Sequence, residues 1–228
     1  MNNYKFLLFD LDNTLLDFNE SERQAICQVL DKYNIPKEFA ITFSKINDKL
    51  WKILEKGEIS REQLKIKRFE LLLAQVNRTE IDHKAISDEY FELISNVSIP
   101  YDFSYEILQK CRVLDYKIVI VTNGSTYPQE KRINSSGLKN LFDYVFISEK
   151  IGASKPSKSF YEYVLSVINA KANQCLIIGD SLTSDILGGV NSGIDTCWYN
   201  PNKIKNTNMI IPTYTVNDLN QIFSILGE

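Results

Sequence analysis

In the second half of the chain, short uninterrupted apolar runs alternate with stretches of helical character. The runs are KIVIVT (117–122), YVFIS (144–148), QCLIIG (174–179) and DTCWY (195–199), and a weaker strand near 213–216 precedes a terminal helix. Helices are expected from near Pro128, after Pro156 and near Thr183. Apolar runs without polar alternation predict strands buried on both faces, and strands separated by helices predict a parallel sheet.

A run of the same kind, KFLLF (5–9), opens the chain and ends abruptly in DLDNT. It cannot stay buried alone, so we expect it to join the same sheet. Between the two parts no convincing strand occurs, and four amphipathic helices are expected at 19–33, 37–55, 60–77 and 80–95. Ser60 and Gln63 have the spacing of a capping box.

The predicted fold class is therefore α/β. A Rossmann-like parallel sheet core with helices on both faces is expected from residues 1–16 and 97–228, with a four-helix domain of residues 17–96 inserted between them. A chain of 228 residues is long enough for one such core and a smaller insert.

The composition of the chain restricts the kinds of catalytic, metal and nucleic-acid site that it can form. The chain has 26 Lys and Arg against 29 Asp and Glu, a net charge of −3, and a single histidine, His83. A Ser-His-Asp triad could use only His83, and a metal site of several histidines is excluded. His83 follows a polar stretch and is expected at the surface. The acid excess argues against binding a nucleic acid polymer, which needs a basic face.

The cysteines and the N-terminal segment indicate the cellular compartment expected for the protein. The four cysteines form no CxxC pair, and Cys175 and Cys197 lie in strand-like runs, so they are expected to be small buried hydrophobes. The apolar run before Asp10 is too short for a signal peptide, and no later run could span a membrane. We expect a cytoplasmic protein without a membrane partner, either monomer or homodimer.

Polar residues follow the predicted strands one after another. These strand-end groups are Asp10 and Asp12, then Thr122, Asn123 and Gly124, then Lys155, and finally Asp180 and Asp185. Each group alone is ordinary turn or helix-cap chemistry. Because ligands of doubly wound sheets bind beyond the carboxyl ends of the strands, all four groups in this order predict one functional site.

The residue types of that site suit phosphoryl transfer. Clustered carboxylates repel one another and favour a bound cation, and a few hard oxygen ligands suit Mg²⁺, with Mn²⁺ as a substitute. A lysine, a hydroxyl and backbone N–H groups suit an anionic phosphoryl group. The set describes transfer through an aspartyl-phosphate, with a small phosphomonoester as the substrate.

Four segments carry a family resemblance: FDLDNTLLD, VTNGS, SKPS and GDSLTSD. In this order they resemble the four motifs of the haloacid dehalogenase-like hydrolase superfamily, and the helical insert is similar to its α-helical cap. The longer segment GDSLTSDILGGVNSGIDTCWYNP, together with TNGS, resembles the pyrimidine 5′-nucleotidase branch, which hydrolyses canonical and non-canonical nucleoside monophosphates.

The resemblance implies a role for each strand-end residue. Asp10 is the nucleophile, and Asp12 is the acid for the leaving alcohol and then the base for water. The metal ligands are the Asp10 and Asp180 carboxylates and the Asp12 backbone carbonyl, while Asp185 holds metal waters or Lys155. The phosphate is bound by Thr122, Asn123, Gly124 and Lys155.

Several activities stay open at this point. Asp12 favours phosphate esters over organic halides, because a halide needs no proton to leave and an alkoxide does. The preferred function is a magnesium-dependent nucleoside 5′-monophosphate phosphatase. The alternatives are a sugar-phosphate or phosphoglycolate phosphatase and a phosphomutase. A phosphonatase would need a lysine from the insert, but the lysines there fit a solvated helix face better. A phospho-receiver signalling domain is disfavoured, since no aspartate ends the run YVFIS.

Residues of the four-helix insert are weaker candidates for the functional site. Most of its aromatic residues are expected to form the small core of a helical bundle: Phe39, Phe43, Trp51, Phe69, Tyr90 and Phe91. Phe18, next to the loop of Asp10 and Asp12 in the sequence, is the better candidate for an aromatic residue that faces the catalytic residues. In the α/β part, Gly188 and Gly189 are expected to allow a helix to approach its neighbours closely.

Overall fold

The computed structural model describes residues 3–228. The chain divides into two compact units, one formed by Met1–Asp17 with Pro100–Glu228 and one by Phe18–Ile99. The first is called the sheet unit below and the second the helical unit.

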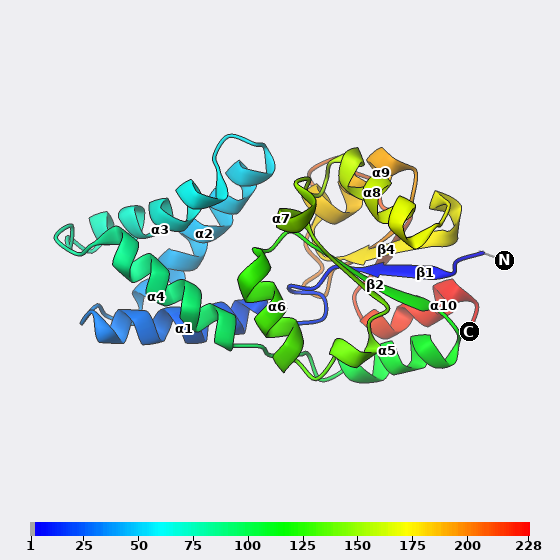
Figure 1. The fold of residues 1–228 in the computed structure, drawn as a ribbon, viewed down its shortest axis with the longest axis horizontal. Coiled ribbons are helices and arrows are strands. Elements are labelled where there is room, and N and C mark those ends of the chain that lie inside the picture. Colours follow the sequence, from blue (N-terminus) through cyan, green and yellow to red (C-terminus); the bar gives the residue numbers. More distant parts are fainter. Residues whose placement is uncertain (1–2) are drawn as a thin grey trace. The chain divides into compact units, whose positions relative to one another are not determined.

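The sheet unit is built on six parallel strands in the order β3-β2-β1-β4-β5-β6 (Figure 1). Their bounds are β1 Phe6–Phe9, β2 Lys117–Thr122, β3 Tyr144–Ile147, β4 Cys175–Gly179, β5 Asp195–Tyr199 and β6 Tyr214–Val216. The predicted α/β fold class is confirmed. Two of the strands, β2 and β5, have the predicted bounds.

The strand order places a topological switch point beside β1. From β1 the chain runs outward through β2 and β3, and it then returns to pair β4 with the other side of β1. Connections leave the carboxyl ends of β1 and β4 in opposite directions, which opens a crevice between them. The residues that follow β1, β2 and β4 therefore lie at one edge of the sheet.

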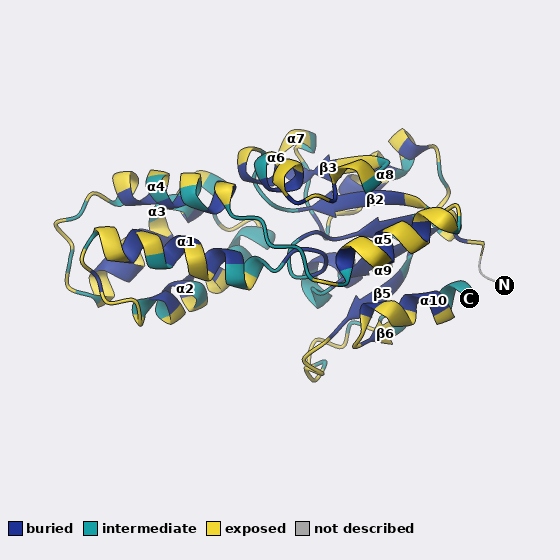
Figure 2. Cartoon of the chain, turned by 90° about the horizontal axis from the view of Figure 1, so that it is seen from below, coloured by how far each residue is buried: buried dark blue, intermediate teal, exposed yellow. Residues whose placement is uncertain are grey.

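Helices cover both faces of the sheet (Figure 1). Leu7 and Phe9 of β1 point into a core closed by α5 (Ser104–Val113) and α10 (Ile222–Leu226). Leu8 points the other way, against α8 (Lys158–Ile168). Figure 2 shows buried strands between helices whose outer faces are exposed. Burial on both faces explains why each strand is a continuous apolar run in the sequence.

Two features of the sheet unit differ from the expectations. The sequence pattern predicts no helix before β2, where α5 lies. The first residue of α5 follows Phe103, which makes no side-chain cap. The helix expected near Thr183 begins with a short π-helical segment, Leu182–Ile186, and continues as α9 (Leu187–Ser192). The remaining helices of this unit are α6 (Thr126–Ser135) and α7 (Ser148–Ile151).

Short 3₁₀ turns complete the sheet unit. They are Lys139–Leu141, Ala172–Gln174 and Leu219–Gln221. Gly188 and Gly189 lie in α9 as close-packing positions: a Cβ on Gly188 would lie 2.4 Å from the Tyr161 ring, and one on Gly189 would lie 2.2 Å from Cγ2 of Thr196. The predicted packing role of this glycine pair is confirmed.

The helical unit contains the four predicted helices with slightly shifted ends. They are α1 Phe18–Lys32, α2 Phe39–Glu55, α3 Arg61–Gln75 and α4 His83–Asn96. Phe43, Phe69 and Tyr90 pack their rings together at centroid distances of 4.9–5.6 Å and form the centre of its core. The Ser60 capping box is present, with Gln63 Oε1 accepting from Ser60 N at 2.8 Å.

Two further expectations concern the cysteines and membrane-spanning segments. Cys175 and Cys197 are buried and unpaired, as predicted for small hydrophobes. Across residues 3–228, none of the helices combines the length and the apolar character needed to span a bilayer.

Candidate active site

Asp10 and Asp12 are presented by the loop that follows β1. The N–H of Asp10 donates to the carbonyl of Ile178 at 2.9 Å, which ties the first loop residue to β4. The loop then turns back on itself, because the N–H of Leu15 donates to the carbonyl of Leu11 at 2.9 Å. Leu11 and Leu15 are fully buried in the core of the sheet unit. These apolar anchors fix the loop, so the two aspartates between and beside them stay at the edge of the sheet.

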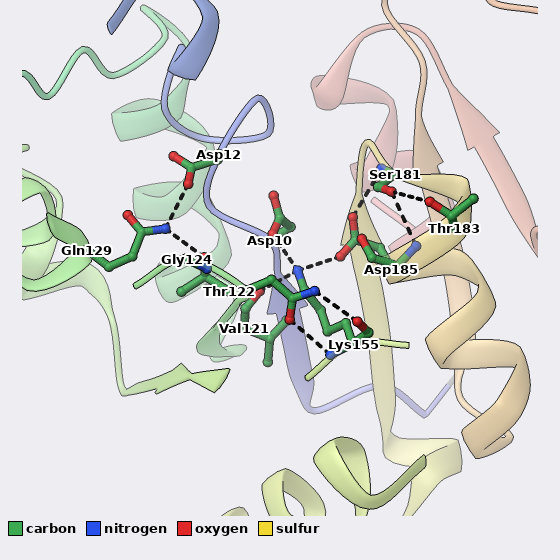
Figure 3. Close-up of polar contacts among 12 residues, drawn as sticks. Asp10, Asp12, Val121, Thr122, Gly124, Gln129, Lys155, Ser181, Thr183 and Asp185 are labelled. Atoms are coloured by element: carbon green, nitrogen blue, oxygen red, sulfur yellow. Dashed lines mark hydrogen bonds and ion pairs between the residues drawn. The ribbon is translucent and has the colours of Figure 1, made fainter. Parts of the chain in front are cut away.

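Lys155 lies at the centre of the site (Figure 3). Its ammonium group donates to Asp10 Oδ1 at 2.5 Å, to Asp185 Oδ1 at 2.7 Å and to the carbonyl of Val121 at 2.8 Å. These three bonds use all the donors of the ammonium group. Lys155 is 1% exposed. Burial opposes its charge, but Asp10 and Asp185 outweigh this and raise the pKa of Lys155 above its usual value.

Three carboxylates form an acidic cluster around that lysine. Asp10, Asp180 and Asp185 each offer one oxygen, and these oxygens lie within 4.8 Å of one another. Burial raises the pKa of Asp10 to about 7, although Lys155 opposes the shift, and burial together with Asp10 raises the pKa of Asp180 well above its usual value. Burial is thus the main reason why the ionised carboxylates are unfavourable, and Lys155 reduces this penalty without removing it.

The cluster fits a divalent cation. Its donors are all hard carboxylate oxygens, and the raised pKa values of Asp10 and Asp180 show that their ionised forms are unfavourable in this buried position, a penalty that a bound cation would offset. Asp185 is already engaged on both oxygens, since Oδ1 accepts from Lys155 and Oδ2 accepts from the N–H of Ser181 at 3.1 Å. Asp185 therefore supports Lys155, and Asp10 and Asp180 are the carboxylates that could bind the cation with less competition from other hydrogen bonds.

The strand-end segment after β2 positions a hydroxyl group. Thr122 Oγ1 accepts hydrogen bonds from the N–H of Gly124 at 3.2 Å and from Gln129 Nε2 at 2.8 Å. Because a hydroxyl oxygen has two lone pairs, these bonds leave its hydrogen to be donated elsewhere. This arrangement makes Thr122 a suitable donor to a phosphoryl oxygen.

Asn123 makes a different set of contacts. Its Nδ2 donates to the carbonyl of Lys155 at 2.9 Å, and its Oδ1 accepts from the N–H of Lys155 at 3.0 Å. The side-chain amide therefore fixes the backbone that carries Lys155. The expected contact between Asn123 and a phosphate could come from its backbone N–H or from the second N–H of its side-chain amide.

Asp12 contacts two residues that the sequence analysis did not identify. Gln129 Nε2 donates to Asp12 Oδ2 at 2.7 Å, and Arg132 Nη1 donates to Asp12 Oδ1 at 2.5 Å. Both come from α6 and are buried. Their spacing of three residues places them on one face of the helix, which is the only signal of them in the sequence. Gly124 leaves room for Gln129, because a Cβ there would lie 2.3 Å from Gln129 Nε2.

The structure thus brings most of the predicted residues together. Lys155 joins Asp10 to Asp185, Asp180 lies beside them, and Gln129 links Thr122 to Asp12. The other signals lie in the helical unit: His83 begins α4 and is half-buried, and Phe18 begins α1 and packs against the core of the helical unit. That Phe18 also faces the catalytic residues stays a prediction.

Comparison with known proteins identifies the family. Residues 7–199 match the haloacid dehalogenase-like hydrolase family. The chain belongs to this family, as the four motifs predicted, and the expected hydrolase class is confirmed.

Three bacterial relatives match the chain over nearly its whole length. The HAD-hydrolase YfnB of Bacillus subtilis is 36% identical over 230 residues, covering 100% of this chain and 97% of the relative. The pyrimidine 5′-nucleotidase PynA of Streptococcus pneumoniae is 36% identical and covers 99% and 96%. The pyrimidine 5′-nucleotidase YjjG of Escherichia coli is 29% identical and covers 98% of each chain.

A solved structure shares the fold throughout. The crystal structure of YfnB bound to magnesium superimposes with a TM-score of 0.92 at 35% identity, covering 99% of this chain and 100% of the YfnB chain.

Proposed function

We propose that this protein is a phosphatase that hydrolyses small phosphomonoesters through an aspartyl-phosphate on Asp10. The observation that carries the proposal is the Lys155 ammonium group shared between Asp10 and Asp185 at the switch point of the sheet. A buried lysine on one oxygen of Asp10 favours the ionised carboxylate and fixes its orientation. A carboxylate held in this way is suited to act as a nucleophile.

In the first step, a carboxylate oxygen of Asp10 forms a bond to phosphorus and the bond between phosphorus and the ester oxygen breaks. Asp12 gives its proton to that oxygen, so the leaving group departs as an alcohol. The hydroxyl of Thr122 donates to a phosphoryl oxygen, and the charge of Lys155 offsets the negative charge around Asp10.

In the second step, water replaces the aspartate on phosphorus. Asp12, now a carboxylate, takes a proton from the water as its oxygen bonds to phosphorus, and the bond between Asp10 and phosphorus breaks. Inorganic phosphate leaves and Asp10 is regenerated. Both roles require the Asp12 carboxyl group to lie beside the reacting oxygen, protonated in the first step and ionised in the second.

Mg²⁺ is the proposed cofactor, with Mn²⁺ as a substitute. The carboxylates of Asp10 and Asp180 and the backbone carbonyl of Asp12 would hold the ion, which offsets negative charge on the carboxylates and the phosphoryl group when bound. The oxygen-only donor set, the raised pKa values of the acids and the magnesium in the YfnB structure support this assignment.

The proposed substrate is a pyrimidine nucleoside 5′-monophosphate. Two relatives that match this chain over almost its full length are named pyrimidine 5′-nucleotidases. The helical unit, inserted directly after the loop of Asp10 and Asp12, is proposed to act as the cap that selects the substrate.

A rate comparison tests the proposal. The purified protein with Mg²⁺ is assayed against pyrimidine and purine monophosphates, sugar phosphates and phosphoglycolate, and we expect the pyrimidine monophosphates to be hydrolysed fastest. Asp10→Asn should abolish turnover of every ester while the circular dichroism spectrum stays unchanged, and EDTA should stop turnover until Mg²⁺ is restored. A preference for sugar phosphates would reject the nucleotidase, and full activity of Asp10→Asn would reject the mechanism.

A further inference from the structure

We propose that Gln129 and Arg132 are positioning residues that orient Asp12 for proton transfer to an alcohol leaving group. The inference rests on the proposed function, because it assigns a role in the step for which Asp12 is the acid. It concerns two residues of α6 that lie far from Asp12 in the sequence and contact it directly in the structure.

The two residues hold the Asp12 carboxylate by both oxygens. Arg132 Nη1 donates to Oδ1 at 2.5 Å, and Gln129 Nε2 donates to Oδ2 at 2.7 Å. Figure 3 shows the Asp12 carboxylate turned toward Gln129. Two donors on different oxygens fix the plane of a carboxylate, and each oxygen keeps a further lone pair for a proton. Asp12 is thereby oriented without losing its capacity to carry a proton.

Gln129 is itself fixed by its surroundings. Its Oε1 accepts from Arg132 Nη1 at 3.0 Å, and its Nε2 donates to Thr122 Oγ1 at 2.8 Å as well as to Asp12. The amide has only two N–H donors, and both are used. Gln129 and Arg132 are 2% and 1% exposed, so water cannot easily replace these bonds. The network joins the proton carrier to the hydroxyl expected to bind phosphate.

The consequence depends on the leaving group. An alkoxide needs a proton as it departs, whereas the phenolate of p-nitrophenyl phosphate is stable without one. A misoriented Asp12 should therefore slow the hydrolysis of an alkyl phosphate more than that of p-nitrophenyl phosphate. A merely structural role of Gln129 and Arg132 would slow both esters equally, because both need the same fold and the same nucleophile.

The experiment compares kcat/KM for uridine 5′-monophosphate and p-nitrophenyl phosphate in the magnesium-loaded protein. The variants are Gln129→Met, which keeps the side-chain volume and removes the hydrogen bonds, and Arg132→Lys, which keeps the charge. Glu130→Met is the matched control, because it places the same side chain on the exposed neighbouring position of α6. Thermal unfolding of each variant confirms that it is folded at the assay temperature.

We expect the ratio of the two kcat/KM values, alkyl over aryl, to fall about tenfold or more in Gln129→Met, since general acid catalysis contributes about 10²–10⁴-fold. Arg132→Lys should lower the ratio in the same direction, and Glu130→Met should leave it unchanged. The Asp12→Asn variant gives the ratio of the two kcat/KM values when the acid is removed completely. Adding Gln129→Met to Asp12→Asn should therefore not lower this ratio further.

Equal losses on both esters, or no loss in either variant, would overturn the inference. A further fall of the ratio in the double variant would also overturn it, because Gln129 would then act independently of Asp12. Failure of the proposed function is visible separately: the wild-type protein would hydrolyse neither ester, and the inference would fall with it.

Discussion

Replacing Asp10 by Asn should make the metal-free protein more stable at mildly alkaline pH. Asp10 is 6% exposed, and burial raises its pKa from 3.8 to about 7, with Lys155 opposing and Asp185 adding to the shift. Its ionised form is therefore less favourable in the folded protein than in the unfolded chain. An uncharged asparagine of nearly the same shape removes this penalty.

The size of the effect follows from that pKa. The shift is about three units, and each unit corresponds to about 1.4 kcal/mol, so the full penalty is about 4 kcal/mol. Because the folded protein binds this proton more tightly, the free energy of unfolding falls as the pH rises from about 4 to about 7. Between about pH 5.5 and pH 8 the loss due to Asp10 is about 2 kcal/mol. Lys155 stays charged throughout this range, since its pKa is raised above 10.5.

Urea unfolding in EDTA at about pH 5.5 and about pH 8 measures this loss. We expect the wild-type protein to lose about 2 kcal/mol more than Asp10→Asn over the interval. The exposed Asp102 provides a control, and Asp102→Asn should follow the wild type. Mg²⁺ should stabilise the wild type more at the higher pH. Equal pH dependence of the wild type and Asp10→Asn would refute the reasoning.

Three further substitutions test packing and capping, each by urea unfolding. Gly189→Ala should cost about 1–3 kcal/mol, because its Cβ would lie 2.2 Å from Cγ2 of Thr196; an unchanged midpoint would contradict this packing. Phe43→Ala should cost about 3–5 kcal/mol, since it removes a buried ring that contacts two others in the helical unit, and a loss below 1 kcal/mol would argue against this core. Ser60→Ala should cost about 1 kcal/mol through the lost capping box, whereas no change would mean that the cap contributes nothing.

The sequence predicted the six strands to within about one residue at each end, because burial on both faces leaves an uninterrupted apolar run. β2 and β5 were placed residue for residue, and the polar residues after β1, β2 and β4 do converge. Parallel strands in one sheet force this convergence, so order along the chain was enough to predict it. The capping box at Ser60 was predictable because its interaction is local.

The sequence did not predict features that depend on tertiary contacts. Gln129 and Arg132 look like ordinary polar residues of a helix surface, and their burial arises because α6 packs beside the loop of Asp12, more than a hundred residues away. The structure also shows the Asn123 side chain bonded to the backbone of Lys155. No spacing rule links these residues, because only the folded sheet brings the two loops together.

The central claim is that Asp10 becomes phosphorylated. Asp12→Asn should retain the first step with p-nitrophenyl phosphate, whose leaving group needs no proton, and should slow hydrolysis of the intermediate. Rapid acid quenching followed by peptide mass spectrometry should then find one phosphoryl group on the peptide that contains Asp10. Release of p-nitrophenolate without this peptide, or a phosphoryl group on another residue, would contradict the account.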